Sequence, residues 1–167
     1  MADKATFTPD EWRTVMESVM ATGMAVSAAE PSGLWGMLKE GFASASAMNE
    51  ANQDQHANPL IRAVVADFAT SEGRKAVQDD LRDRLKGAKS SDIKDRSITL
   101  LREASSIVDA KAPEDSAAFK AWLQQIGQRV ADAANEGGFL GFGGVQVTDA
   151  EKATLDDISK ALEKTTA

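Results

Sequence analysis

The 167-residue sequence lacks cysteine and tyrosine, and it contains one histidine and four prolines. The absence of cysteine excludes disulfide bonds and thiolate metal sites. His56 lies alone in a polar stretch, so acid–base catalysis would have to rest on carboxylates or lysines. No carboxylate pair stands out along the chain. We therefore predict no catalytic residues and favour a protein that is not an enzyme.

Long apolar runs are also missing. No stretch approaches the ~18 residues that a membrane-spanning helix needs. The opening residues Met1-Ala2-Asp3-Lys4 begin an acidic, polar leader and no apolar run follows a basic start, which is not the pattern of a secretory signal. With no cysteine to oxidise, the chain is compatible with a reducing compartment, and we expect a cytoplasmic protein without a membrane span.

An excess of positive charge is lacking as well, because the net charge is −7. Residues 1–56 and 113–167 are acidic, whereas residues 57–112 are slightly basic. Aspartates interrupt the basic cluster at 74–89, and such compensation is not typical of a nucleic-acid footprint. We expect no nucleic-acid partner and interpret the charges mainly as solvated helix faces.

Apolar residues recur at helical spacing almost throughout, which predicts an all-α fold. We expect a single domain of about seven helices over 1–167, with flexible ends at 1–7 and 165–167. Proline and capping residues mark several helix starts, at Thr8-Pro9, Asn58-Pro59 and Thr148. The predicted helices begin near residues 9, 34, 59, 71, 91, 113 and 148, with the second covering about 34–50 and the fourth about 71–86.

Two parts of the chain resemble each other, which suggests an internal duplication. Both have apolar or glycine residues at a spacing of four, four and three, and both then enter a glycine-aromatic segment. The matching positions are Val15, Val19, Gly23 and Val26 in one part and Phe119, Leu123, Gly127 and Val130 in the other. We place the pseudo-repeats at about 8–50 and 113–164, joined by helices within 59–112.

The second repeat carries the more specific pattern. A helix containing Ile126-Gly127 and Val130-Ala131 enters a glycine-bearing acidic loop, and Thr148-Asp149-Ala150-Glu151-Lys152 opens the next helix. This arrangement resembles the tellurite-resistance TerB-like family. The resemblance implies a helical domain of about seven helices with a repeated unit, a role in stress response, partner proteins and metal binding at acidic loops.

A divalent cation such as Ca²⁺ or Mg²⁺ is the cofactor that this resemblance implies. Such ions prefer carboxylate and carbonyl oxygens. The candidate ligands are Glu30, Asp132, Asn135, Glu136, Asp149 and Glu151. Asp149 and Glu151 also fit a capping box that begins at Thr148, and this alternative assigns them to the helix start rather than to a metal.

The glycine-aromatic segments are the second candidate site. Their apolar residues are Trp35, Leu38, Phe42, Phe139, Leu140 and Phe142. Large apolar side chains are usually buried, so these residues could fill the core between the two repeats. If they are exposed, they would form a surface for a partner protein, a hydrophobic ligand or a membrane surface.

Overall fold

The computed structural model describes residues 2–29, 58–136 and 147–163, and within these ranges it is helical without any strand. This confirms the all-α prediction. The helix expected at 34–50 lies outside the described residues. The elements are η1 (Lys4–Thr6), α1 (Pro9–Ala28), α4 (Pro59–Ala69), α5 (Ser71–Arg84), α6 (Ser90–Lys111), α7 (Pro113–Glu136) and α8 (Asp149–Leu162). None of these helices is long and apolar enough to cross a membrane.

Local capping chemistry sets the helix starts that the sequence predicted. The Thr8 hydroxyl caps α1 by accepting the Glu11 amide, while the Glu11 carboxylate accepts the Thr8 amide at 2.8 Å. The Asn58 side chain caps α4, and Pro59 follows at the first helical position. α7 runs through Glu136, slightly beyond the loop start predicted at residue 135.

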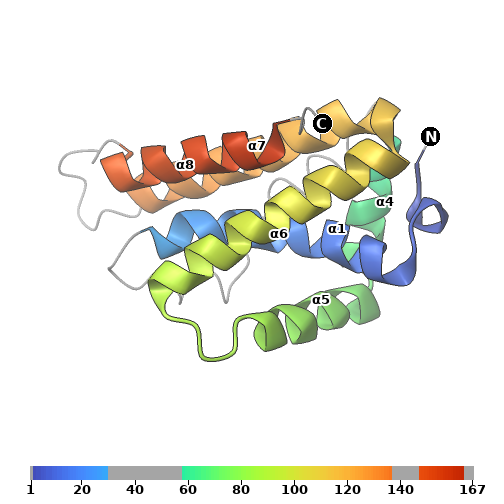
Figure 1. Cartoon of the computed structure of the whole chain (residues 1–167), viewed down its shortest axis with the longest axis horizontal. Coiled ribbons are helices and arrows are strands. Elements are labelled where there is room, and N and C mark those ends of the chain that lie inside the picture. The colour runs from blue at the N-terminus through green and yellow to red at the C-terminus, as the bar shows by residue number, and fades with distance from the viewer. Residues whose placement is uncertain (1, 30–57, 137–146, 164–167) are drawn as a thin grey trace.

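Helix α1 is the centre of the molecule and packs against α4, α5, α6, α7 and α8. Thirteen of its 20 residues are buried. Figure 1 shows α1 and α7 running in one direction, while α6 and α8 run in the other. Hydroxyls that face this core bond to their own helix, as Thr22 does to the Ser18 carbonyl at 2.8 Å. These buried hydroxyl groups are thereby satisfied within α1 itself.

The two matching sequence stripes both face the interior. Seven of the eight positions are buried, and Val130 is half-buried. Gly127 allows a close approach, since a Cβ atom there would lie 3.3 Å from both Thr22 and Leu155. The stripes therefore bring α1, α7 and α8 together. Unrelated helices would also share a core, so this packing does not distinguish a duplication from two independent helices.

Helix α5 lies at the periphery, along one side of the bundle in Figure 1. Only Val77 and Leu81 are buried among its 14 residues. Its charged residues are mainly exposed, as the sequence predicted. Gly87 follows the helix with a φ of 73°, a left-handed conformation that glycine adopts without strain.

The beginning of the chain differs from the prediction of a flexible segment at 1–7. Ala2 and Phe7 are buried, and the Phe7 ring lies 5.7 Å from the ring of Trp12. The Ala2 amide donates to Asp115 at 2.8 Å, and the side chain of Asn58 donates to the same carboxylate. A polar corner therefore joins residues 2–7 to the starts of α4 and α7. Residues 165–167 lie outside the described residues.

Candidate functional site

Three helix ends that adjoin the glycine-aromatic segments lie at one end of the bundle. α1 ends there at Ala28, α7 ends there at Glu136, and α8 begins there at Asp149, as Figure 1 shows on its left side. Segment 30–57 is thus attached to this end by its first residue, and segment 137–146 by both of its ends. The proposed contact residues Trp35, Leu38, Phe42, Phe139, Leu140 and Phe142, like His56, lie outside the described residues.

The predicted metal ligands do not form a cluster in the part of the chain that the structure describes. Asp132 is exposed and accepts a hydrogen bond from Gln128 at 2.9 Å. Asp149 is fully exposed, with Lys152 4.0 Å away. No group of three potential metal ligands occurs within the described ranges. Glu30 lies outside them, as do the side chains of Asn135 and Glu136.

Glu151 serves as a helix cap. Its side chain is buried and turns back on Thr148, whose amide donates to the carboxylate at 2.8 Å. The Thr148 hydroxyl in turn accepts the Glu151 amide at 3.2 Å. Both parts of the predicted capping box are present. The alternative interpretation therefore holds for Glu151, and its carboxylate is engaged within its own helix start.

A second site of interest, which the sequence analysis did not identify, is the surroundings of Glu17 on α1. The side chain of Glu17 is completely buried. Arg84 of α5 places its Nε atom 3.0 Å from the carboxylate. Neither carboxylate oxygen receives a well-aligned hydrogen bond in the described structure, so the contact is mainly electrostatic. Glu103 of α6 lies 3.8 Å from the same arginine and shares its charge.

Burial governs the protonation of Glu17. Loss of solvent raises the pKa of its carboxyl group above the ordinary value of 4.5, and the attraction of Arg84 only partly opposes this. Arg84 is itself about half exposed, at 45%. The centre of the fold thus contains a carboxylate whose charge is poorly compensated and whose countercharge comes from the peripheral helix.

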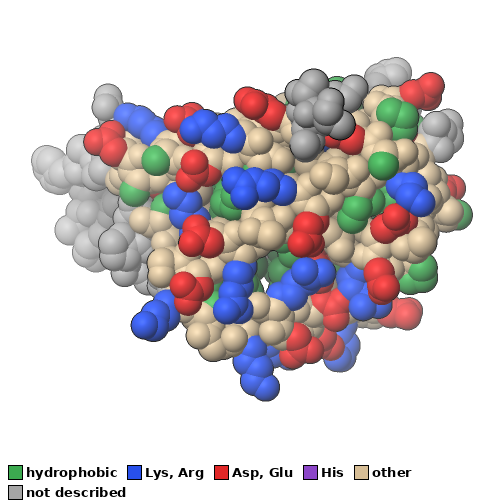
Figure 2. All heavy atoms as spheres, in the orientation of Figure 1, with side chains coloured by type: hydrophobic (Ala, Val, Ile, Leu, Met, Phe, Trp, Pro, Cys, Tyr) green, Lys and Arg blue, Asp and Glu red, His purple; other side chains and the backbone are tan. Residues whose placement is uncertain are grey.

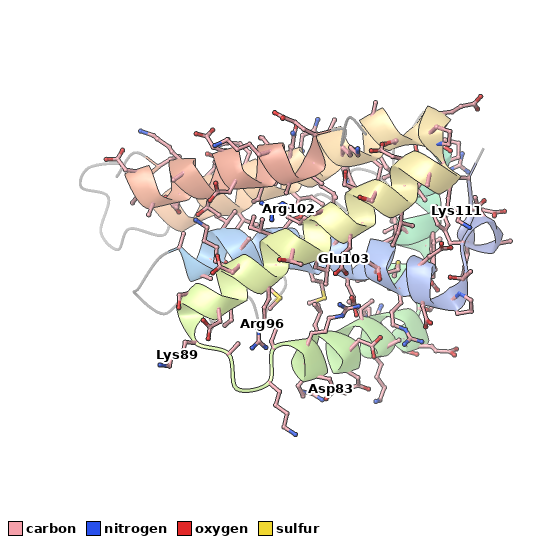
Figure 3. All side chains as sticks on the ribbon, in the orientation of Figure 1. Asp83, Lys89, Arg96, Arg102, Glu103 and Lys111 are labelled. Carbon is pink, nitrogen blue, oxygen red and sulfur yellow. The ribbon has the colours of Figure 1, made fainter. Side chains whose placement is uncertain are left out.

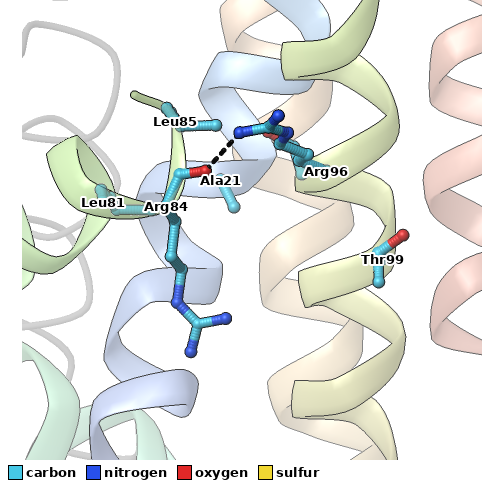
Figure 4. A pocket seen from close by; sticks show the side chains of 7 residues that line it. Ala21, Leu81, Arg84, Leu85, Arg96 and Thr99 are labelled. Carbon is cyan, nitrogen blue, oxygen red and sulfur yellow. Dashed lines mark hydrogen bonds between the residues drawn. The ribbon is translucent and has the colours of Figure 1, made fainter. Parts of the chain in front are cut away.

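Further polar contacts hold α5 in place. Arg13 of α1 pairs with Asp80 through an N–O distance of 2.9 Å. At the end of α5, Arg96 of α6 donates to the Arg84 carbonyl at 2.7 Å. Figure 4 shows this bond and shows the Arg84 guanidinium directed away from Arg96. Figure 3 shows Arg96 and Glu103 projecting from α6 on the side of α5.

Between these helices lies a recess of about 160 Å³. Its walls combine apolar side chains with a few polar ones. The lining residues are Ala21 of α1, Leu81, Arg84 and Leu85 from the end of α5, and Arg96, Ser97 and Thr99 of α6. In Figure 2, apolar atoms are visible at the bottom of a hollow between α5 and α6. The recess adjoins the Glu17–Arg84 pair because Arg84 belongs to both.

One sequence signal could have identified Glu17. Residues 14–29 contain no other charged residue, so a carboxylate stands alone in a helix that is otherwise apolar or small. A charge in such surroundings is expected to need a partner from elsewhere. The identity of that partner, Arg84, has no comparable signal, because arginine and lysine recur throughout 74–89.

Comparison with protein-family models, with curated proteins and with solved structures finds no match to this chain.

Proposed function

We propose that this chain is a non-enzymatic, TerB-like helical module that binds a partner protein through its two glycine-aromatic segments. The observation that supports this proposal is the common location of the ends of α1 and α7 and the start of α8. Attachment at one end of a bundle allows both segments to contribute to one surface. Aromatic residues are enriched in the centres of protein interfaces, which fits the composition of these segments.

The cellular role that we propose follows from the TerB-like resemblance and is a cytoplasmic stress response. A divalent cation could order the acidic residues of the second segment. The capping role of Glu151 reduces the oxygen donors available for such an ion, leaving Glu30, Asp132, Asn135, Glu136 and Asp149 as the remaining candidates. We therefore give partner binding priority over metal binding.

Photocrosslinking tests the proposal directly. A photoreactive amino acid would replace Trp35 in one variant and Phe139 in another. The control replaces Glu114, an exposed residue in the first turn of α7, at the other end of that helix. We expect the same protein to be crosslinked from positions 35 and 139 and not from 114. Different proteins from the two segments, or equal capture from position 114, would contradict a shared surface.

Affinity measurements with the purified partner provide the second step. Truncating an aromatic anchor at the centre of an interface costs about 2 kcal/mol or more, which corresponds to roughly 30-fold weaker binding. We expect this loss for Phe139→Ala and Trp35→Ala. Exposed Lys152→Ala, near the start of α8, is the control and should change the affinity little.

The metal hypothesis has its own test. An ion present at 100 times its dissociation constant should add about 2.7 kcal/mol to the free energy of unfolding. Denaturation would be measured with Ca²⁺, with Mg²⁺ and with a chelator. We would compare Glu136→Gln with Asp156→Asn, an exposed residue of α8 outside the candidate set. An identical unfolding curve in all conditions would exclude a resident divalent ion.

The alternative function is binding of a hydrophobic ligand or a membrane surface by the same segments. It is tested with a variant that keeps Trp35 and carries Trp12→Phe and Trp122→Phe. A shift of Trp35 fluorescence on addition of lipid vesicles would favour this alternative over a protein partner. An unchanged spectrum would exclude contact of Trp35 with the vesicles.

A further inference from the structure

The recess between α1, α5 and α6 combines three features that are separate from the glycine-aromatic segments. It has apolar walls, a serine hydroxyl group that is open to the recess and bonds to no described residue, and an arginine at its edge. We propose that it binds a small amphipathic carboxylate, with the apolar body inside and the carboxylate at Arg96.

The apolar walls come from three side chains. Ala21 and Leu81 are buried, and Leu85 is half-buried. The volume of about 160 Å³ is enough to hold a small ring, since an apolar cavity of about 150 Å³ accepts benzene. A ligand body of roughly six to eight non-hydrogen atoms therefore fits.

Ser97 and Thr99 are the two lining residues with a hydroxyl group, and Ser97 is the more buried of them. The residue is only 3% exposed, and it lines the recess. Its hydroxyl makes no hydrogen bond to any residue of the described ranges, whereas Ser18 and Thr22 in the same core both bond to backbone carbonyls. The Ser97 hydroxyl is not one of the fully enclosed unpaired polar atoms of the described residues, so it is open to the recess. A ligand oxygen would supply the missing partner.

Arg96 gives the site its charge preference. It is exposed, and its one contact in the described structure is the bond to the Arg84 carbonyl at 2.7 Å. Guanidinium carries five N–H donors, so most of them remain available. No carboxylate of the described residues lies within ion-pair distance of Arg96, in contrast to Arg84, which has Glu17 and Glu103. An anion is therefore favoured at Arg96 rather than at Arg84.

Titration with benzoate tests the proposal. Amide chemical shifts of the ¹⁵N-labelled protein would be followed at millimolar benzoate. Benzyl alcohol and benzylamine carry the same ring with a neutral and a cationic group. We expect saturable shifts at residues 81–99, with benzoate binding more tightly than benzyl alcohol and benzylamine binding least. No saturable shift with benzoate, or equal binding of benzylamine, would overturn the proposal.

Variants locate the site. Losing a hydrogen bond to a charged group weakens binding about tenfold or more. We therefore expect Arg96→Met to bind benzoate more weakly by this factor. Arg102→Met is the matched control, since Arg102 is an exposed arginine of the same helix that does not line the recess. Equal affinities of the two variants for benzoate would overturn the assignment of the anion to Arg96.

Ser97→Ala tests the serine hydroxyl of the lining and should remain folded, because it removes one small polar group that bonds to no other described residue. We expect it to bind benzoate about three- to tenfold more weakly, through loss of a hydrogen bond to the carboxylate. Unchanged benzoate affinity would overturn the role of the hydroxyl. This result is independent of the glycine-aromatic segments, so it separates failure of the recess from failure of partner binding.

Discussion

Helices α1 and α5 lie side by side but differ greatly in how much of each is buried. α1 buries thirteen of its 20 residues and contacts every other α-helix of the described ranges, whereas α5 buries only Val77 and Leu81 of its 14 residues. To these two apolar side chains α5 adds charged contacts such as Arg13–Asp80 and Arg84–Glu17. The comparison teaches that a bundle can combine a firmly packed central helix with an outer helix that buries little apolar surface.

Typical free-energy contributions indicate how much more weakly α5 is attached to the bundle than α1. Full burial of a large apolar side chain contributes about 1.5–3 kcal/mol, and α5 has two such residues. Ion pairs with substantial solvent exposure contribute about 0–1 kcal/mol each. We infer that α5 can open in a local transition that leaves α1 packed against α6 and α7.

The largest expected effect is a cavity beside α1. Met16 is 2% exposed, and truncating a buried methionine to alanine costs about 2–5 kcal/mol. We expect Met16→Ala to lower the free energy of global unfolding by this amount in urea denaturation. Leu81→Ala should mainly increase hydrogen exchange of the α5 amides. If Leu81→Ala lowered global stability as much as Met16→Ala, the two helices would form one cooperative unit.

The second effect concerns the junction between α4 and α5. A Cβ atom at Gly73 would lie 2.3 Å from the Asp67 carbonyl oxygen, which is backbone and cannot move aside easily. Gly73→Ala should therefore cost about 1–3 kcal/mol, the usual range for overpacking. Hydrogen exchange should increase in α4 and α5 and remain slow in α1. Gly127→Ala is the comparison in the core, where a Cβ atom meets movable side chains at 3.3 Å.

A smaller effect is a pH dependence of the contact between the two helices. Burial raises the folded-state pKa of Glu17 above 4.5, so the folded state holds this proton more tightly than the unfolded state. The resulting stability is fully present below pH 4.5 and is lost as the pH rises through the folded-state pKa. Glu17→Gln should exceed the wild type in stability at neutral pH, and the difference should shrink on acidification towards pH 4.5.

The control for this experiment is Glu103→Gln, which removes a half-exposed carboxylate beside the same Arg84. If the stability difference for Glu103→Gln shrank on acidification as strongly as that for Glu17→Gln, the effect would not come from the burial of Glu17. The stability that Asp67 contributes depends on pH with the opposite sign. Burial raises the pKa of Asp67, but the hydrogen bonds from Trp12 and Lys4 outweigh this and hold it below 3.8, so its contribution is lost as the pH falls through that lowered value.

The smallest effect is expected on the outer face of α5. Asp79 pairs with Lys75 and Arg82 along its own helix, and these contacts lower the pKa of its carboxyl group. Asp79→Asn should leave global unfolding unchanged within error, because the pairs are exposed and join no other helix. A measurable loss of global stability would show that α5 is coupled to the core more strongly than its burial indicates.

The features that were predictable from the sequence are those with local causes. The capping box at Thr8, the Asn58-Pro59 start and the Thr148 box each depend on residues within four positions of one another. Helical spacing also identified the buried stripe of α1. These features fix the ends and the inward faces of the helices, which is why the all-α fold could be inferred.

The features that were not predictable join distant parts of the chain. The pairing of Glu17 with Arg84, the polar corner at Asp115 and the recess beside Arg96 all depend on how helices meet. The spacing of residues along one helix carries no information on which other helix its side chains will contact. Of the candidate metal ligands, Glu151 is explained by its local cap, and no group of three potential ligands occurs within the described ranges.

The position of α1 has a consequence for synthesis of the protein on the ribosome. α1 is completed at Ala28, whereas α6 begins only at Ser90 and α7 at Pro113. The helix with the most buried residues therefore leaves the ribosome long before the helices that cover it. During that interval its apolar residues are exposed to other nascent chains, and exposed apolar surface promotes aggregation. We expect early fragments that end before α6 to require chaperones, although the complete chain covers this helix by itself.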